Sequence, residues 1–253
     1  MTHDRELLSR KAYVIEAHKE LIATPSIPNE EIIKGEIALD RTTPQEVLEE
    51  LLNDKSSYVL SCLRKRGYKT RPIFNKPKAV IGQNLIFRNA TINDAAFIVD
   101  LRTHEKKSKH ISKTSNDLKR QEAWLEKYNH DCEQVYFIIQ NKQDESVGTV
   151  RLYDIQDYSF CWGSWILKED VPSSYAIESA LLVYCFALSL GFERAHFEVR
   201  KGNVSVWRFH ERFGAHKISE TLENYLYSIS YEAIRQSLKK YSKYLPNGFA
   251  VED

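Results

Sequence analysis

One histidine in the sequence has the chemistry to exchange a proton near neutral pH. His210 lies in the stretch 204–213, a short amphipathic helix pattern that stops at Gly214. Imidazole has an unperturbed pKa of about 6.5, so this side chain can give a proton when charged and accept one when neutral. The alternative interpretation is a histidine that only packs on its helix.

A buried carboxylate is predicted at Glu178. This residue lies in the first turns of a long helix pattern, inside the apolar run 176–182. Burial raises the pKa of a carboxyl group and suits it to act as a base. The alternative is a structural role, in which Glu178 stabilises the first half of the helix or a hydrogen-bond network. Asp154 and Glu198 are further candidate bases.

Two tryptophans flank a small polar pair in the segment 161–165. Alternation along a strand predicts that Trp162 and Ser164 share one face, while Trp165 takes the other. One interpretation is core packing. The other is an aromatic wall for a sugar ring or nucleobase, to which Ser164 donates a hydrogen bond.

A basic cluster lies at the end of the helix pattern that begins at Thr91. It consists of Arg102, His104 and Lys106. These side chains could pair with phosphate groups of a substrate. A solvated run of charges is the alternative.

The elements that must position these groups alternate between strands and helices after Gly82. Strands are predicted at 84–90, 135–140, 146–155, 158–167 and 194–200, with one or two more within 216–230, and helices at 91–103, 115–129, 174–190, 204–213 and 231–244. The order mixes hairpins with crossover helices. It therefore predicts an α+β fold with a mixed, twisted central sheet flanked by helices.

The residues before this domain have a different pattern. Apolar residues recur at helical spacing between Leu7 and Leu21, and Thr43-Pro44 with Glu46 is typical of a helix start. Residues 70–82 contain proline and lysine and are predicted to be a linker. We expect a mainly helical segment of unknown role at 1–82 and a second domain at 83–253 that ends in a closing helix.

The composition is that of a globular protein, with 42% hydrophobic and 28% charged residues among 253. The formal net charge of +1 lacks the basic excess typical of nucleic-acid-binding proteins, so no nucleic acid partner is expected. The N-terminus has no apolar signal core, and the longest apolar run, 180–190, is too short to span a bilayer. These features predict a cytoplasmic protein with no membrane association.

The four cysteines form no CxxC pair, and no histidine lies at zinc-ligand spacing from them. Metal use is therefore not expected.

Two sets of residues carry a resemblance to a known family. The first combines Gln121 and Trp124 with the strand YFIIQ at 136–140 and VGTV at 147–150; the second runs from Asn203 to Gly214. Together they resemble the GNAT superfamily of N-acetyltransferases over about 84–230. Within it, the chain is similar to ribosomal-protein alanine acetyltransferases and to enzymes that N-acetylate amino sugars on nucleotide carriers.

This resemblance implies acetyl-CoA as co-substrate and assigns roles by register. Asn203 matches the asparagine that hydrogen-bonds the pantetheine arm, and Phe209 stands at a leucine position. His210 stands where many relatives have a tyrosine that protonates the departing CoA thiolate. The backbone N–H groups that bind the oxyanion in the family fall on Trp165, Ile166 and Leu167.

The family's pyrophosphate loop is only partly matched, since Ala176 alone fits its glycine-rich pattern. A helix N-terminus still offers unpaired N–H groups and a partial positive charge. Ser173, Ser174, Tyr175 and Ala176 are therefore the predicted diphosphate-binding residues. The missing glycines favour an alternative, a non-catalytic member that serves as an interaction module.

The resemblance thus predicts an N-acetyltransferase for a small amino acceptor, the amino sugar of a nucleotide sugar in surface polysaccharide (O-antigen, capsule or lipopolysaccharide) biosynthesis. Arg102, Trp162 and Ser164 are its predicted acceptor-binding residues. A protein N-terminal acetyltransferase of the ribosomal-protein type is the other enzyme alternative. The sequence leaves open whether the protein forms a homodimer.

Overall fold

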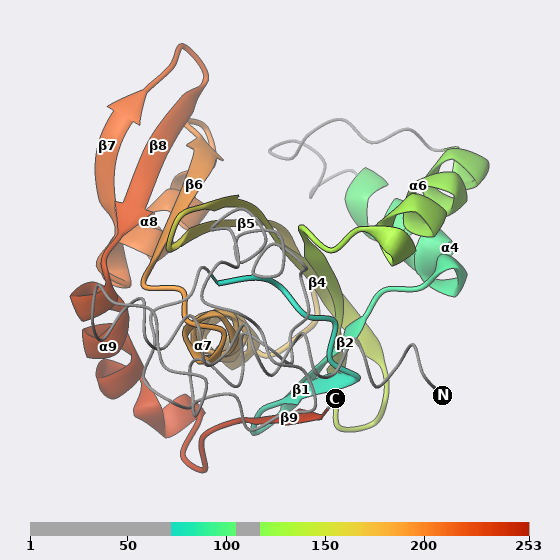
Figure 1. Ribbon diagram of the computed structural model, residues 1–253, viewed down its shortest axis with the longest axis horizontal. Helices are drawn as coiled ribbons and strands as arrows, with labels where there is room; N and C mark the ends of the chain where they lie inside the picture. Colours follow the sequence, from blue (N-terminus) through green and yellow to red (C-terminus); the bar gives the residue numbers. More distant parts are fainter. Residues whose placement is uncertain (1–71, 105–116, 253) are drawn as a thin grey trace, which may run out of the picture. The chain divides into compact units, whose positions relative to one another are not determined.

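The computed structural model describes residues 72–104 and 117–252 (Figure 1). The described residues from Phe74 onward belong to one compact unit. The helices predicted before residue 72 lie outside the described residues, as does Lys106.

A nine-stranded sheet forms the centre of this unit. Its strands are β1 (Ala79–Ile81), β2 (Leu85–Asn89), β3 (Val135–Asn141), β4 (Ser146–Gln156), β5 (Ser159–Leu167), β6 (Arg194–Arg200), β7 (His216–Glu220), β8 (Asn224–Ile229) and β9 (Ala250–Glu252). Their spatial order is β7-β8-β6-β5-β4-β3-β2-β1-β9. β5 and β6 run parallel, and the neighbouring strands elsewhere run antiparallel. The prediction of an α+β fold with a mixed sheet is confirmed.

Helices cover both faces of this sheet. They are α4 (Ala95–Thr103), α6 (Leu118–His130), α7 (Ser174–Ser189), α8 (Val204–Arg212) and α9 (Tyr231–Lys240). Phe137 on β3 packs against Phe186 of α7, whereas Tyr136 belongs to a second apolar cluster with Leu125 of α6 and Ile98 of α4. Alternation along β3 thus places α7 on one face and α4 with α6 on the other, which explains why the strand is apolar throughout (Figure 1).

The helix ends follow the local sequence. Asp117 caps α6 by accepting the N–H of Arg120, and Ser230 caps α9 by accepting the N–H of Ala233. Gly191 follows α7 with a φ of 94°, a conformation that glycine adopts without steric cost. α7 thus spans Ser174–Ser189, close to the predicted 174–190, although Ser173 makes no side-chain capping hydrogen bond at its start.

The segment predicted as a linker, 70–82, differs from expectation. Phe74 is buried and its ring lies 4.9 Å from that of Phe192. β1 follows it and pairs with both β2 and β9. A three-residue strand is too short to show an alternating pattern, and its pairing with the C-terminal end is non-local, so neither could be predicted from the sequence.

Candidate active site

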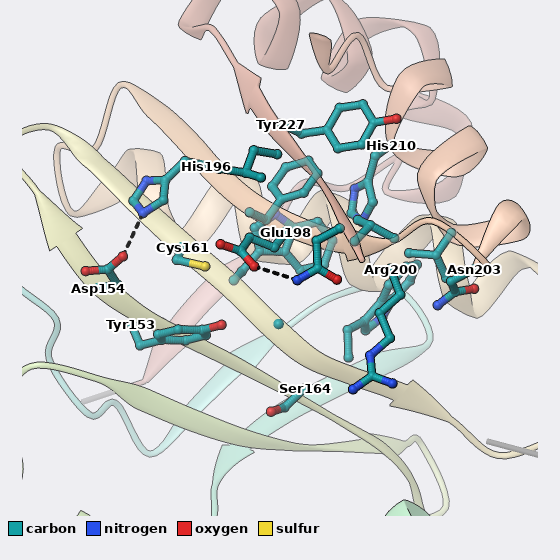
Figure 2. A pocket seen from close by; sticks show the side chains of 18 of the residues that line it. Tyr153, Asp154, Cys161, Ser164, His196, Glu198, Arg200, Asn203, His210 and Tyr227 are labelled. Atoms are coloured by element: carbon teal, nitrogen blue, oxygen red, sulfur yellow. Dashed lines mark hydrogen bonds and ion pairs between the residues drawn. The ribbon is translucent and has the colours of Figure 1, made fainter. Parts of the chain in front are cut away.

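β5 and β6 are paired only at their beginnings. The parallel register runs from Ser159↔Arg194 to Cys161↔His196, after which β5 stays with β4 while β6 stays with β8. A pocket of about 600 Å³ is lined by the two strands where they part (Figure 2). The edge of β5 beyond Cys161 is therefore not paired with β6.

The pocket is lined from both faces of β6. Phe197 and Val199 are buried on the side of the strand where His210 lies. His196, Glu198 and Arg200 alternate with them and belong to the opposite face, and members of both sets line the pocket. The pocket thus reaches through the sheet, with an apolar side and a charged side.

His210 lies on the apolar side and is only 5% exposed. Its ring centroid lies 4.2 Å from that of Phe197, 5.0 Å from that of Trp162 and 6.0 Å from that of Trp165. Its Nδ1 is buried and has no hydrogen-bond partner among the described residues.

Burial lowers the pKa of His210 to about 3. The expectation of an imidazole that changes charge near neutral pH is therefore wrong, because the apolar rings around it exclude the charged form. At neutral pH the ring is uncharged, with one N–H donor and one acceptor nitrogen.

A chain of three hydrogen-bonded side chains stands at the other end of the pocket. The Nδ1 of His196 lies 2.8 Å from the hydroxyl of Ser159, and its Nε2 lies 3.0 Å from a carboxylate oxygen of Asp154. Figure 2 shows this contact at one end, with Arg200, Asn203 and His210 at the other. Both nitrogens of His196 are engaged, so the free carboxylate oxygen of Asp154 is the atom of this chain best suited to accept a proton.

Glu198 lies beside this chain on the same charged face of β6. Its carboxylate accepts a hydrogen bond of 2.9 Å from the side-chain amide of Asn224 on β8. The thiol of Cys161 also lines the pocket, and burial raises its pKa to about 11, so it stays protonated at neutral pH. The acidic groups of the pocket that can accept protons are thus Asp154 and Glu198.

A bulge in β5 corrects the predicted placement of Trp165. Thr149 pairs with Ile166 but Arg151 pairs with Gly163, so β5 contains one extra residue. Ser164 absorbs it with a φ of 47°. The alternation is shifted by one beyond this point, and the ring of Trp165 lies 5.4 Å from that of Trp162 instead of on the opposite face.

A second bulge positions Asp154. Tyr153 pairs with Cys161 and Gln156 pairs with Ser159, which leaves one extra residue on β4. Asp154 has a φ of 51° there, and its side chain meets His196 on β6. Left-handed conformations at non-glycine residues cost about 1–3 kcal/mol and gather at functional sites.

The three predicted acceptor-binding residues come together. Arg102, Trp162 and Ser164 all line the pocket, and the Nη1 of Arg102 donates to the Ser164 hydroxyl at 3.1 Å. The backbone carbonyl of Ser164 accepts a 2.8 Å hydrogen bond from Thr149, which holds the bulge in place.

Only some of the residues predicted for the co-substrate line the pocket. Trp165 and Asn203 line the pocket, and Ile166 and Leu167 pair with β4 while their other edge is not paired with β6. Ser173, Ser174, Tyr175 and Ala176 form the start of α7, with no acidic residue in its first turn, and they do not line the pocket. The end of β5 and the start of α7 are thus separated by a short turn.

Glu178 does not belong to the pocket. It is fully buried, and one carboxylate oxygen accepts the N–H groups of Asn84 at 2.6 Å and Leu85 at 2.9 Å, while the other accepts the side-chain amide of Asn84 at 2.8 Å. These bonds tie α7 to the start of β2. The structural alternative for Glu178 therefore fits its geometry, and we do not retain it as a base.

The sequence pattern missed His196 and Arg200 as pocket residues, and it missed Ser159 as the hydrogen-bond partner of His196. Their positions follow from strand pairing and bulges, for which no spacing signal exists. The described ranges contain no group of three or more metal-ligating side chains. Within the same ranges, no helix is long and apolar enough to cross a membrane.

Comparison with known proteins identifies the fold. A family model described as an acetyltransferase (GNAT) domain matches residues 84–216, more than half of the chain. A solved structure described as apo FdhC, a nucleotide-linked sugar GNAT, is 42% identical and covers 68% of this chain and 98% of its own, with a TM-score of 0.59. No curated protein matches the chain.

Two solved spermidine acetyltransferase structures from Vibrio cholerae share the fold at low identity. Mutant forms of the spermidine/spermine N-acetyltransferase SpeG are 15% identical, cover 60% of this chain and 97% of their own, and give a TM-score of 0.52. A dodecameric spermidine N-acetyltransferase is 16% identical and covers 59% of this chain and 95% of its own, with a TM-score of 0.51. At this identity the likeness concerns the fold alone.

Proposed function

The chain belongs to the GNAT family of N-acetyltransferases, and from this premise we propose that it acetylates the amino group of a nucleotide-linked sugar with acetyl-CoA. The observation that carries the proposal is the pocket that passes between β5 and β6, with one apolar and one charged side. Such a passage lets two substrates approach one another from different sides of the sheet, as a group transfer between them requires.

The charges of the pocket support an acceptor that is both anionic and an amine. Arg102 and Arg200 line it together with Asp154 and Glu198. Guanidinium groups suit the phosphates of a nucleotide sugar, and carboxylates suit its ammonium group. A polyamine would face two like charges, so the pocket favours a nucleotide sugar over spermidine.

The co-substrate fits the residues that face the open edge of β5. Bound acetyl-CoA supplies an activated acetyl group to the site. The N–H groups at the start of α7 suit its diphosphate, and Asn203 suits its pantetheine arm. Those N–H groups among Trp165, Ile166 and Leu167 that point away from β4 are the proposed donors to the carbonyl oxygen. The unpartnered Nδ1 of His210 supports a ligand or water at that nitrogen.

The acceptor amine must lose a proton before or during attack, and His210 is too weak a base for that step. We assign the step to the charged side of the pocket, where Asp154 accepts the proton and His196 orients it. Neutral His210 then donates its single N–H as a hydrogen bond to the departing CoA sulfur, and this sulfur takes up the second proton of the amine as the tetrahedral intermediate collapses to the amide. The proton on Asp154 returns to water, because 53% of its side chain is exposed.

An acetylated nucleotide sugar is a donor for glycosyl transfer. We therefore propose that the enzyme works in the cytoplasm and that its product is used to build a surface polysaccharide. A homodimer stays a prediction.

A panel of acceptors tests the proposal. Purified enzyme and acetyl-CoA are incubated with UDP- and dTDP-linked amino sugars, the same amino sugars without nucleotide, spermidine, and peptides with N-terminal alanine or serine. Acetylated product is measured by mass spectrometry, since the exposed thiol of Cys132 would disturb a thiol-reagent assay. We expect the highest kcat/KM for a nucleotide-linked amino sugar. Equal turnover of the free sugars, or preference for spermidine or peptides, contradicts the proposal.

A further inference from the structure

Arg151, in the middle of β4, forms no direct ion pair within the described part of the chain, and the carboxylate of Asp131 acts on its pKa only from a longer distance. The ion pairs found there involve Arg88, His196, Lys201 and Lys217 as cations. The Nε of Arg151 is buried and has no hydrogen-bond partner. A buried Nε–H without a partner on a half-buried guanidinium is unusual, because this donor loses water without replacement.

Aromatic rings fix the orientation of this side chain. Its guanidinium carbon lies 4.6 Å from the ring centroid of Tyr153 and 5.2 Å from that of Trp124 on α6. Cation–π contacts of this kind hold the plane of the group but leave its N–H donors unused. The guanidinium is therefore positioned, and its donors remain available.

Arg151 lies next to residues that line the pocket. It pairs with Gly163 on β5, and both Gly163 and Tyr153 line the pocket. A Cβ at Gly163 would lie only 3.1 Å from the hydroxyl of Tyr153, so glycine at this position lets the Tyr153 ring pack closely against β5. The same ring contacts the guanidinium of Arg151, which places this charge directly behind the pocket wall.

A second guanidinium approaches from α4. Arg102 lines the pocket beside Ser164, and its charge helps to lower the pKa of Arg151, after the larger effect of burial. Two like charges on the same face of the sheet repel one another, and an anion bound between them would relieve the repulsion. Guanidinium groups bind phosphate oxygens with two parallel hydrogen bonds, which suits a diphosphate.

We propose that Arg151 and Arg102 form the subsite for the diphosphate of the nucleotide-linked acceptor, on the sheet face covered by α4 and α6. This inference rests on the proposed function, because it names the part of the acceptor that the enzyme recognises. CoA is the other source of a diphosphate. Its proposed site is the start of α7, on the opposite face of the sheet.

Arg151→Met and Arg102→Met test the subsite, with Arg194→Met as the matched control. Arg194 is an exposed arginine at the start of β6 that does not line the pocket. Binding of UDP, dTDP and CoA is measured by calorimetry, and KM is measured separately for the nucleotide sugar and for acetyl-CoA. Thermal melting identifies any variant that does not fold.

We expect Arg151→Met to weaken UDP or dTDP binding and to raise the acceptor KM by about 10- to 100-fold, the worth of a lost charge-assisted hydrogen bond. CoA affinity, the acetyl-CoA KM and the control variant stay unchanged, and Arg151→Lys falls between wild type and Arg151→Met. Arg102→Met changes the same constants in the same direction.

Two results overturn the inference. One is an unchanged nucleotide affinity and acceptor KM in a folded Arg151→Met variant while wild type acetylates a nucleotide sugar. The other is a rise in the acetyl-CoA KM alone, which assigns Arg151 to CoA. If wild type acetylates no nucleotide sugar but binds UDP or dTDP in an Arg151-dependent way, the proposed function fails and the subsite stands.

Discussion

The imidazole of His210 on α8 lies 4.2 Å, centroid to centroid, from the ring of Phe197 on β6. The next residue along β6, Glu198, belongs to the opposite, charged face of the strand. One strand therefore separates a neutral histidine from the carboxylates of the pocket. This separation lets the two sides of the pocket do different chemistry, hydrogen-bond donation on one and proton acceptance on the other.

Removing the nitrogens of His210 tests its assigned role. His210→Phe keeps a ring among the aromatic neighbours, so the fold is preserved. We expect kcat to fall roughly 100-fold, because the donor to the sulfur is lost. The affinity for acetyl-CoA, measured by calorimetry, stays nearly intact. Turnover within a few-fold of wild type would show that His210 only packs.

The pH dependence of the free energy of unfolding tests whether His210 is uncharged in the folded protein. Its pKa is about 6.5 in the unfolded chain and about 3 in the fold, so between these values the unfolded chain binds a proton that the folded chain does not. The free energy of unfolding therefore decreases as pH falls through this window, by up to about 1.4 kcal/mol per pH unit. Denaturant unfolding of wild type and His210→Phe at several pH values measures it. The variant shows a smaller decrease, and parallel curves would contradict a neutral buried His210.

Asp154→Asn tests the proton acceptor. The amide keeps the size of the side chain but cannot take up a proton, so we expect kcat/KM at neutral pH to fall roughly 100-fold. The loss shrinks at higher pH, where more of the acceptor amine is already neutral. His196→Gln has a smaller effect in the same direction, because it disturbs only the orientation of Asp154.

Glu198→Gln is the control for this prediction, since it changes the other carboxylate of the pocket. A pH-dependent loss in Glu198→Gln, with near-normal activity in Asp154→Asn, would move the role to Glu198.

Glu178→Gln separates a structural carboxylate from a catalytic one. Glutamine keeps one oxygen for the backbone N–H groups of Asn84 and Leu85, but its amide nitrogen cannot accept the side-chain amide of Asn84. We expect a loss of about 1–3 kcal/mol in the free energy of unfolding, because two N–H groups then face each other in a buried site without an acceptor. kcat, measured well below the melting temperature, stays close to wild type. A large loss of kcat with unchanged stability would restore Glu178 as a base.

A negative charge introduced at the start of α7 tests whether the diphosphate of acetyl-CoA binds there. Acetyl-CoA at 100 times its Kd stabilises the folded state by about 2.7 kcal/mol and raises the melting temperature. Ser174→Asp places a negative charge in the first turn of the helix, where it favours the helix but repels a diphosphate. We expect the variant to be as stable as wild type without ligand and to bind acetyl-CoA at least about 10-fold more weakly. Equal affinity would place the diphosphate elsewhere.

The sequence by itself determined the order of strands and helices in residues 84–244. Periodicity is a local property, so α7 spans Ser174–Ser189, close to the predicted range 174–190. The resemblance drew attention to Asn203 and His210, and both line the pocket.

Only the tertiary structure decided which face each side chain occupies and which charges survive burial. Bulges at Ser164 and Asp154 shift the alternation by one residue, and no sequence pattern marks them. The pKa of His210 and the partners of Glu178 depend on residues distant in the chain. Strand register and burial are set by non-local packing, and this is why the chemistry of the pocket could not be derived from spacing alone.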